Sequence, residues 1–71
     1  MPSSDIRSYL YEAAKGELWI TFVTGRRYVY AAIPKDVFDA FKAAPSRGTF
    51  FNLKIRGHYA YREVPREGLR Q

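Results

Sequence analysis

Two segments that alternate in hydropathy and meet at a glycine constrain the fold of this chain more than any other feature. Residues 17–24 and 27–33 each place apolar or aromatic side chains at every second position. These positions hold Leu18, Ile20, Phe22, Tyr28 and Tyr30. A period of two is typical of β-strands, because successive side chains of a strand point to opposite faces. The short connection that contains Gly25 therefore predicts an antiparallel hairpin.

The turn of this hairpin decides which face its tyrosines occupy. A two-residue type I′ turn would need a positive φ at Thr24, which a β-branched residue resists. A three-residue loop with Gly25 in the left-handed region avoids this strain and pairs Ile20 with Tyr28, which puts both tyrosines in the core layer. A type II′ turn that starts at Gly25 is also feasible, and its register would send the tyrosines to the opposite face, beside Trp19. The chemistry of Thr24 favours the three-residue loop.

The neighbouring segments predict a further strand and a helix. Residues 6–11 alternate as a first strand would, and the side chains expected on one of its faces are Ile6, Ser8 and Leu10. Residues 34–44 predict a helix, because Pro34 suits the first helical position and two aspartates lie near the positive end of the helix dipole. Apolar residues recur at helical spacing and are expected to pack on the sheet: Val37, Phe38, Phe41 and Ala44.

The C-terminal half predicts a second, shorter helical turn and a last strand. The hydroxyl of Ser46 can cap the helical turn, and Gly57 is placed to end it. Residues 58–64 have the alternation of a strand. The predicted fold class is therefore α+β: a small antiparallel sheet with a central hairpin, one helix packed on it, a second short helical turn and a final strand.

Length and composition predict one small domain that has no covalent or metal support. The 71 residues have material for one core, expected within residues 6–64, between a frayed N-terminus at 1–5 and a flexible C-terminal tail at 65–71. No cysteine is present, which excludes disulfides and thiolate metal sites. No apolar run approaches the roughly 18 residues that span a bilayer, and the start lacks a signal-peptide pattern, so a cytoplasmic location without membrane contact is expected.

Positive charge and aromatic rings gather in the C-terminal part of the chain. The formal net charge is +5, and the stretch from Arg47 to Arg62 contains no acidic residue. Basic side chains interleaved with aromatic ones suit a polyanion that carries stackable rings. The expected partner is RNA, either single-stranded or tRNA-like. The candidate nucleic-acid-binding residues are Arg47, Lys54, Arg56, Arg62 and Tyr59.

The joint spacing of these segments resembles the KTSC domain, a short module named for its place at the C-terminus of some lysyl-tRNA synthetases and also found as a stand-alone small bacterial protein. The resemblance runs from about Ile6 to Tyr61. Matches to the family's Y-x-Y, V-P and S-x-G-x-x-F-N motifs and to its last tyrosine are Tyr28, Tyr30, Ile33, Pro34, Ser46, Gly48, Phe51, Asn52 and Tyr61. Departures are Arg47 where the family often has Lys, Leu10 where it often has Gly, and Ala60 where it often has Pro. The resemblance implies that the motif residues belong to the core and that no activity is established, and its synthetase context suggests RNA by association.

Residues for catalysis are missing from the sequence. His58 is the only histidine, and no pair of carboxylates has the spacing of a helical acid/base or metal site. No glycine-rich run resembles a phosphate-binding loop. A non-catalytic module is expected, with no cofactor, metal or small-molecule substrate. The alternative partner is another protein that meets the sheet edge or the helix, with the charge incidental, and salt dependence separates the two cases.

Overall fold

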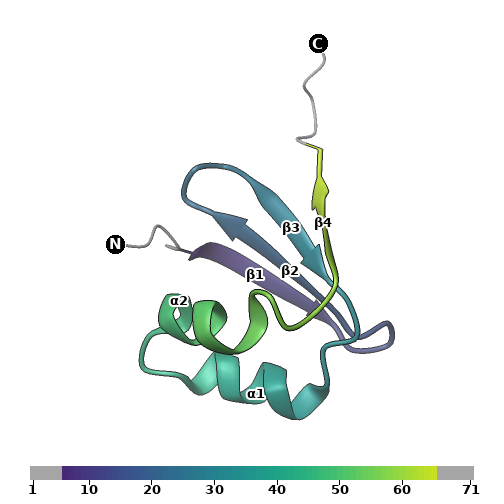
Figure 1. The fold of residues 1–71 in the computed structure, drawn as a ribbon, viewed down its shortest axis with the longest axis vertical. Coiled ribbons are helices and arrows are strands. Elements are labelled where there is room, and N and C mark those ends of the chain that lie inside the picture. The colour runs from purple at the N-terminus through teal and green to yellow at the C-terminus, as the bar shows by residue number, and fades with distance from the viewer. Residues whose placement is uncertain (1–5, 66–71) are drawn as a thin grey trace.

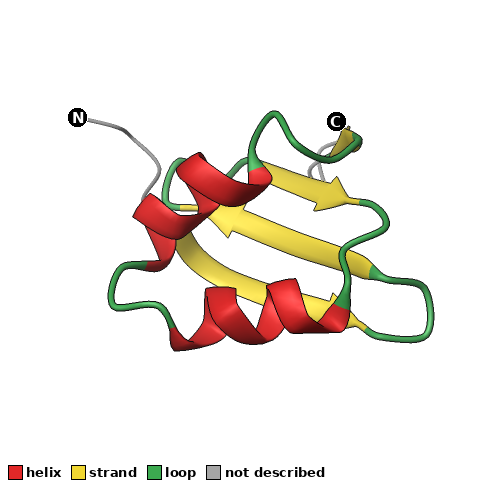
Figure 2. Cartoon of the chain, turned by 60° about the horizontal axis from the view of Figure 1, so that its bottom comes forward, coloured by secondary structure: helices red, strands yellow, loops and turns green. Residues whose placement is uncertain are grey.

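Within residues 6–65, which the computed structural model describes, a four-stranded antiparallel sheet carries helices on one face (Figure 1). The elements are β1 (Ile6–Glu12), β2 (Glu17–Phe22), β3 (Arg27–Tyr30), α1 (Lys35–Ala43), α2 (Arg47–Phe50), a π-helical segment η1 (Phe51–Ile55) and β4 (Tyr61–Val64). The strands lie in the order β1-β2-β3-β4. Figure 2 shows the helices over the same face of the sheet. The α+β prediction is confirmed, and the tails predicted at 1–5 and 65–71 lie outside the described residues except for Pro65.

The hairpin register places both of its tyrosines on the face that the helices cover. The pairs are Leu18 with Tyr30 and Ile20 with Tyr28. Gly25 has a φ of 95°, and its N–H donates to the C=O of Phe22 at 2.8 Å. Glycine takes this left-handed conformation without steric penalty, so Thr24 keeps an ordinary backbone. The three-residue loop predicted from Thr24 is therefore confirmed.

The core lies between the helices and the covered face of the sheet. Its buried side chains are Leu18, Ile20, Tyr30, Ile33, Phe41, Phe51 and Ile55. Val37 and Phe38 of α1 pack against this cluster, as their helical spacing predicts. Phe41 is completely buried, and its ring meets the ring of Tyr9 edge-on with 5.1 Å between centroids. Ring packing thus supplies much of the core of a chain that has no cysteine.

Helix α1 begins one residue later than predicted. Pro34 is the N-cap residue, with extended backbone angles (φ −66°, ψ 153°), and its C=O accepts from the N–H of Val37 and Phe38. The C-cap is Ala44, whose backbone is extended. The next residue is Pro45, and the ring of a proline disfavours the helical conformation in the residue before it, so the helix ends here. The helix predicted over 34–44 is confirmed, with its first helical position at Lys35 rather than at the proline.

The faces of β1 differ from those predicted by simple alternation. The register of its pairing with β2 shifts between Ile6 and Ser8. This bulge turns Ile6 toward the core, on the same side as Tyr9 and Tyr11. The expectation that Ile6 shares a face with Ser8 and Leu10 is therefore wrong, because an extra residue in a strand reverses the alternation beyond it.

Two strand boundaries also differ from the predictions. β3 ends at Tyr30 rather than Ile33, because Ala32 adopts a φ of 58° and leaves the β region. β4 begins at Tyr61, and residues 58–60 form a connection instead of the start of a strand. The ladder between β3 and β4 is consequently short.

The second helical segment is confirmed at both of its predicted ends and is longer than one turn. The hydroxyl of Ser46 accepts from the N–H of Thr49 at 3.2 Å, which is an N-cap. The segment then widens into η1, where the N–H of Arg56 donates to the C=O of Phe51 at 2.8 Å. Gly57, at a φ of 82°, ends it. Single-turn π-helices of this kind often lie at functional sites.

Candidate nucleic-acid interface

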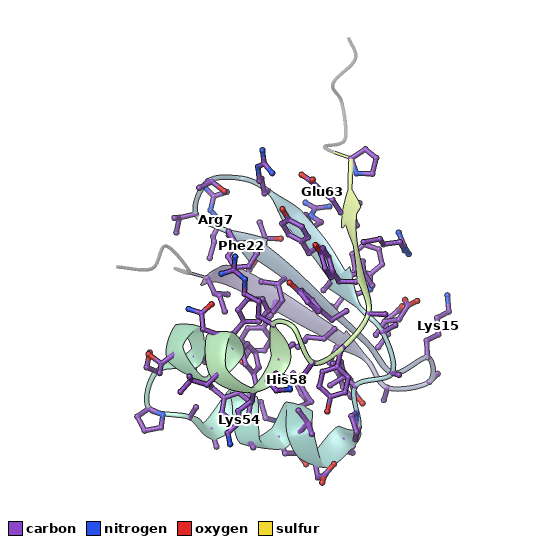
Figure 3. The ribbon with its side chains drawn as sticks, viewed as in Figure 1. Arg7, Lys15, Phe22, Lys54, His58 and Glu63 are labelled. Atoms are coloured by element: carbon purple, nitrogen blue, oxygen red, sulfur yellow. The ribbon has the colours of Figure 1, made fainter. Side chains whose placement is uncertain are left out.

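A cleft of about 420 Å³ opens between the β2–β3 hairpin, β4 and the end of η1. We call it the aromatic cleft. Its aromatic walls are Phe22, Tyr28, Tyr30, Phe51 and Tyr61, and its basic side chains are Arg26 and Arg56. Figure 3 shows Phe22 on the sheet above the helices and Glu63 at the far end of β4. β4 extends past the helices, which cover the other end of this face of the sheet (Figure 1).

Tyr61 is the exposed ring of the aromatic cleft. It stacks on Tyr30 with 5.4 Å between centroids and 26° between planes, and lies 5.7 Å from the ring of Tyr28. Tyr30 is only 4% exposed and meets Phe51 edge-on at 5.2 Å, whereas Tyr61 is 60% exposed. A buried aromatic base therefore holds an accessible ring in a fixed orientation. Such a ring is a ready surface for stacking.

Two guanidinium groups lie at the cleft. Nη1 of Arg26 donates to the phenol oxygen of Tyr28 at 3.4 Å and lies 3.8 Å from a carboxylate oxygen of Glu63. These two contacts, the hydrogen bond first, raise the pKa of Arg26. Nη1 of Arg56 donates to Oδ1 of Asn52 at 3.2 Å. Among residues 6–65 no acidic side chain lines the cleft itself, so its lining is positive, and the carboxylate of Glu63 beside it offsets part of the charge of Arg26.

The phenol of Tyr30 ionises at a higher pH than that of an ordinary tyrosine. Burial raises its pKa to about 12, the nearby phenols of Tyr61 and Tyr28 add to this rise, and the positive charge of Arg56 opposes it. An ordinary tyrosine is already neutral at pH 7, and this rise in pKa extends the neutral range of Tyr30 further into alkaline pH. A negatively charged ligand meets arginines without repulsion from this ring.

Stability is expected to fall as the pH rises from about 10 to about 12. The phenol of Tyr30 ionises near pH 10 in the unfolded chain and near 12 in the folded one, so the folded state binds more protons in this window. Up to about 2 to 3 kcal/mol of unfolding free energy is lost across it. Urea unfolding at several pH values measures the loss, and Tyr30→Phe is the control that should lack this component. Equal pH dependence in both proteins would contradict the assignment.

The structure places three of the sequence-predicted residues at different depths around η1. Arg56 lines the aromatic cleft, as its candidate role requires. Lys54 is exposed on η1 on the side toward α1 (Figure 3). Tyr59 is half-buried in the connection to β4 and packs against the core. Lys54 and Tyr59 do not line the cleft.

The other two predicted cations lie farther apart. The guanidinium of Arg47, at the start of α2, lies 5.4 Å from the ring centroid of Tyr9. Arg62 is paired with Val29, and since paired residues share a face, it lies on the uncovered side of the sheet. The basic run of the sequence therefore does not form one continuous surface.

The family-motif residues expected in the core have several roles. Tyr30 and Phe51 are buried, whereas Tyr28, Gly48 and Asn52 are partly buried and Pro34, Ser46 and Tyr61 are exposed. Arg26 was not predicted from the sequence, because it stands beside the hairpin turn and far from the basic run. The hairpin register could have indicated Arg26, because this register brings the turn to the edge of the face that carries Tyr28 and Tyr30.

Comparison with known proteins assigns the chain to a family. A family model described as the KTSC domain matches residues 2–59. The chain belongs to the KTSC domain family. The crystal structure of a KTSC domain protein from Yersinia pestis is similar to this one, with a TM-score of 0.83, 31% sequence identity and 92% of each chain covered. The KTSC resemblance inferred from motif spacing is thus confirmed.

The relatives of this KTSC domain occur in two contexts. An uncharacterized protein from Stutzerimonas stutzeri is 36% identical over 62 residues, which cover 86% of this chain and 87% of that protein. A lysine–tRNA ligase from Nostoc sp. is 33% identical over 61 residues, which cover 86% of this chain and 11% of the ligase. The chain thus spans about a tenth of the ligase's length.

In the part of the KTSC domain that the structure describes, no helix is long and apolar enough to cross a membrane.

Proposed function

We propose that this KTSC domain is a non-catalytic module that binds single-stranded RNA in the aromatic cleft. The observation that carries the proposal is the presence, in one cleft, of an exposed stacking ring, Tyr61, and two arginines, Arg26 and Arg56. RNA-binding proteins recognise unpaired bases by stacking them on aromatic side chains. Guanidinium groups bind phosphate oxygens through charge-assisted hydrogen bonds.

The chemistry of the cleft favours a nucleotide over other ligands. A cationic ligand, of the kind that binds in aromatic cages, would be repelled by the positive charges of Arg26 and Arg56. An apolar ligand would gain nothing from the two charges. The volume of about 420 Å³ is within the range of small-ligand sites, which fits one nucleotide unit. The lysine–tRNA ligase relative supports RNA as the polymer that carries this nucleotide.

This proposal changes the residue set expected from the sequence. Arg56 keeps its role, and Tyr61 replaces Tyr59 as the stacking ring. Lys54 lies outside the cleft, and Arg62 lies on the opposite face of the sheet, so we assign neither a direct contact with the bound nucleotide. Arg62 therefore becomes the basis of a matched control.

A salt titration of RNA binding tests the proposal. Anisotropy of a labelled mixed-sequence single strand is measured with the wild type and with Arg26→Gln/Arg56→Gln. Log affinity falls as log salt rises, and each lost phosphate contact should make this negative slope shallower by about 0.7. The loss of both contacts should make it shallower by about 1.4. At about 50 mM salt, affinity should fall at least about tenfold.

The control variant is Arg27→Gln/Arg62→Gln, which removes the same charge from the uncovered face. Both arginines are exposed, and β-strand pairing places them beside Val64 and Val29. This variant should keep most of the wild-type affinity and slope. Equal losses in both double variants would mean unspecific attraction and would contradict the cleft. No binding by the wild type at low salt would overturn the RNA proposal in favour of a protein partner.

A further inference from the structure

A second cleft, of about 360 Å³, lies between the start of β1 and the start of α2. We call it the arginine cleft. Its walls are residues 6–9 and 45–48, which contribute two arginines, Arg7 and Arg47, and two serines, Ser8 and Ser46. Both arginines are exposed. This part of the chain thus brings two positive charges from distant sequence positions to one hollow.

The fold brings the two arginines of this cleft together from β1 and α2. The guanidinium of Arg47 lies 5.4 Å from the ring centroid of Tyr9, whose ring is itself packed edge-on against Phe41 at 5.1 Å. Arg7 stands at the bulge of β1, and bulges re-aim the side chains of a strand. Among residues 6–65 the ion pairs involve Arg26 and Lys35, and neither Arg7 nor Arg47 is paired with a carboxylate.

The arginine cleft adjoins the aromatic cleft along one end of the sheet. Ile6 lines the arginine cleft and is paired with Phe22, which lines the aromatic cleft. On the helical side, Gly48 lines the arginine cleft and Phe51 lines the aromatic one. Residues three apart in a helix are neighbours on its surface. The linings of the two clefts therefore meet through the Ile6–Phe22 pair and through one turn of the helical segment.

We propose that the arginine cleft is a phosphate-binding subsite for the strand whose base occupies the aromatic cleft. This inference rests on the proposed function and adds that the ligand is an oligonucleotide rather than a free nucleotide. The arginine cleft suits phosphate because its one ring, that of Tyr9, is already covered by Arg47. A duplex is disfavoured, because a base must leave its stack to reach Tyr61.

A length series of ligands tests the subsite. The probes are uridine 5′-monophosphate and oligouridylates of increasing length, which are titrated against the wild type and Arg7→Gln/Arg47→Gln. Wild-type affinity should rise with length until both clefts are filled and then level off. The double variant should keep the affinity for the monophosphate and lose about tenfold or more for the longer strands, with a salt slope smaller by about 1.4.

Two further variants keep the failures of the subsite and of the proposed function apart. Arg27→Gln/Arg62→Gln controls for net charge and should follow the wild type at every length, and thermal melts confirm that each variant is folded. The subsite is overturned if Arg7→Gln/Arg47→Gln has the wild-type affinity at every length. It is also overturned if the affinities of this variant for the monophosphate and for long strands fall by the same factor. In either case the proposed function survives when Arg26→Gln/Arg56→Gln loses binding. Absence of binding by the wild type would overturn both.

Discussion

Replacing Phe41 by Ala is expected to leave the chain largely unfolded at 25 °C. Phe41 is completely buried, and its ring contacts those of Tyr9, Phe50 and Phe38 at centroid distances of 5.1, 6.2 and 6.3 Å. It therefore joins β1, α1 and the second helical segment. Truncation of a buried Phe to Ala costs about 3 to 5 kcal/mol. A single core in a domain of this length, without disulfides, rarely supplies more than about 3 to 5 kcal/mol of net stability, so the loss takes most or all of it.

Circular dichroism during heating and during urea unfolding measures this effect. The matched control is Leu53→Ala, since Leu53 is also an apolar residue of a helical segment but is 64% exposed. Its loss should change the unfolding free energy by less than about 1 kcal/mol. A cooperative melt of Phe41→Ala within a few degrees of the wild type would show that the helix does not use this residue to cover the sheet.

The hairpin shows how far local chemistry predicts this fold. The resistance of Thr24 to a positive φ and the freedom of Gly25 were sufficient to choose the register, and that register placed Tyr28 and Tyr30 correctly. The bulge in β1 and the positive φ of Ala32 were not predictable in this way. Both are imposed by how distant elements pack, and neither residue carries a local signal for its conformation.

The candidate site shows a similar division. The sequence identified a basic and aromatic segment, but proximity in sequence does not give proximity in space. Tyr61 and Arg62 are neighbours in β4, and strand geometry sends them to opposite faces. Arg26 reaches the cleft from the turn between β2 and β3, which is far from the basic segment in the sequence. The alternation of β4 shows that Tyr61 and Arg62 lie on opposite faces. Only the pairing of Tyr61 with Tyr30 shows which of the two lies on the tyrosine face.

Replacing Tyr61 by Ala is expected to weaken RNA binding strongly while leaving the fold intact. The loss of one base–aromatic stack costs about 1 to 3 kcal/mol, which is about 5-fold to 150-fold in affinity. The ring is 60% exposed, so its contacts with Tyr30 and Tyr28 contribute less to stability than those of the buried rings. Because β4 is an edge strand, the substitution leaves the core elements in place.

Affinity for one single-stranded RNA, measured with the wild type, Tyr61→Phe and Tyr61→Ala under the same salt conditions, tests the stacking role of the cleft most directly. Tyr61→Phe keeps the ring and removes only the hydroxyl, so it should bind within about threefold of the wild type if stacking carries the interaction. Tyr61→Ala should bind at least about fivefold more weakly, with a thermal melt close to that of the wild type. Equal affinity for the three folded proteins would contradict the account.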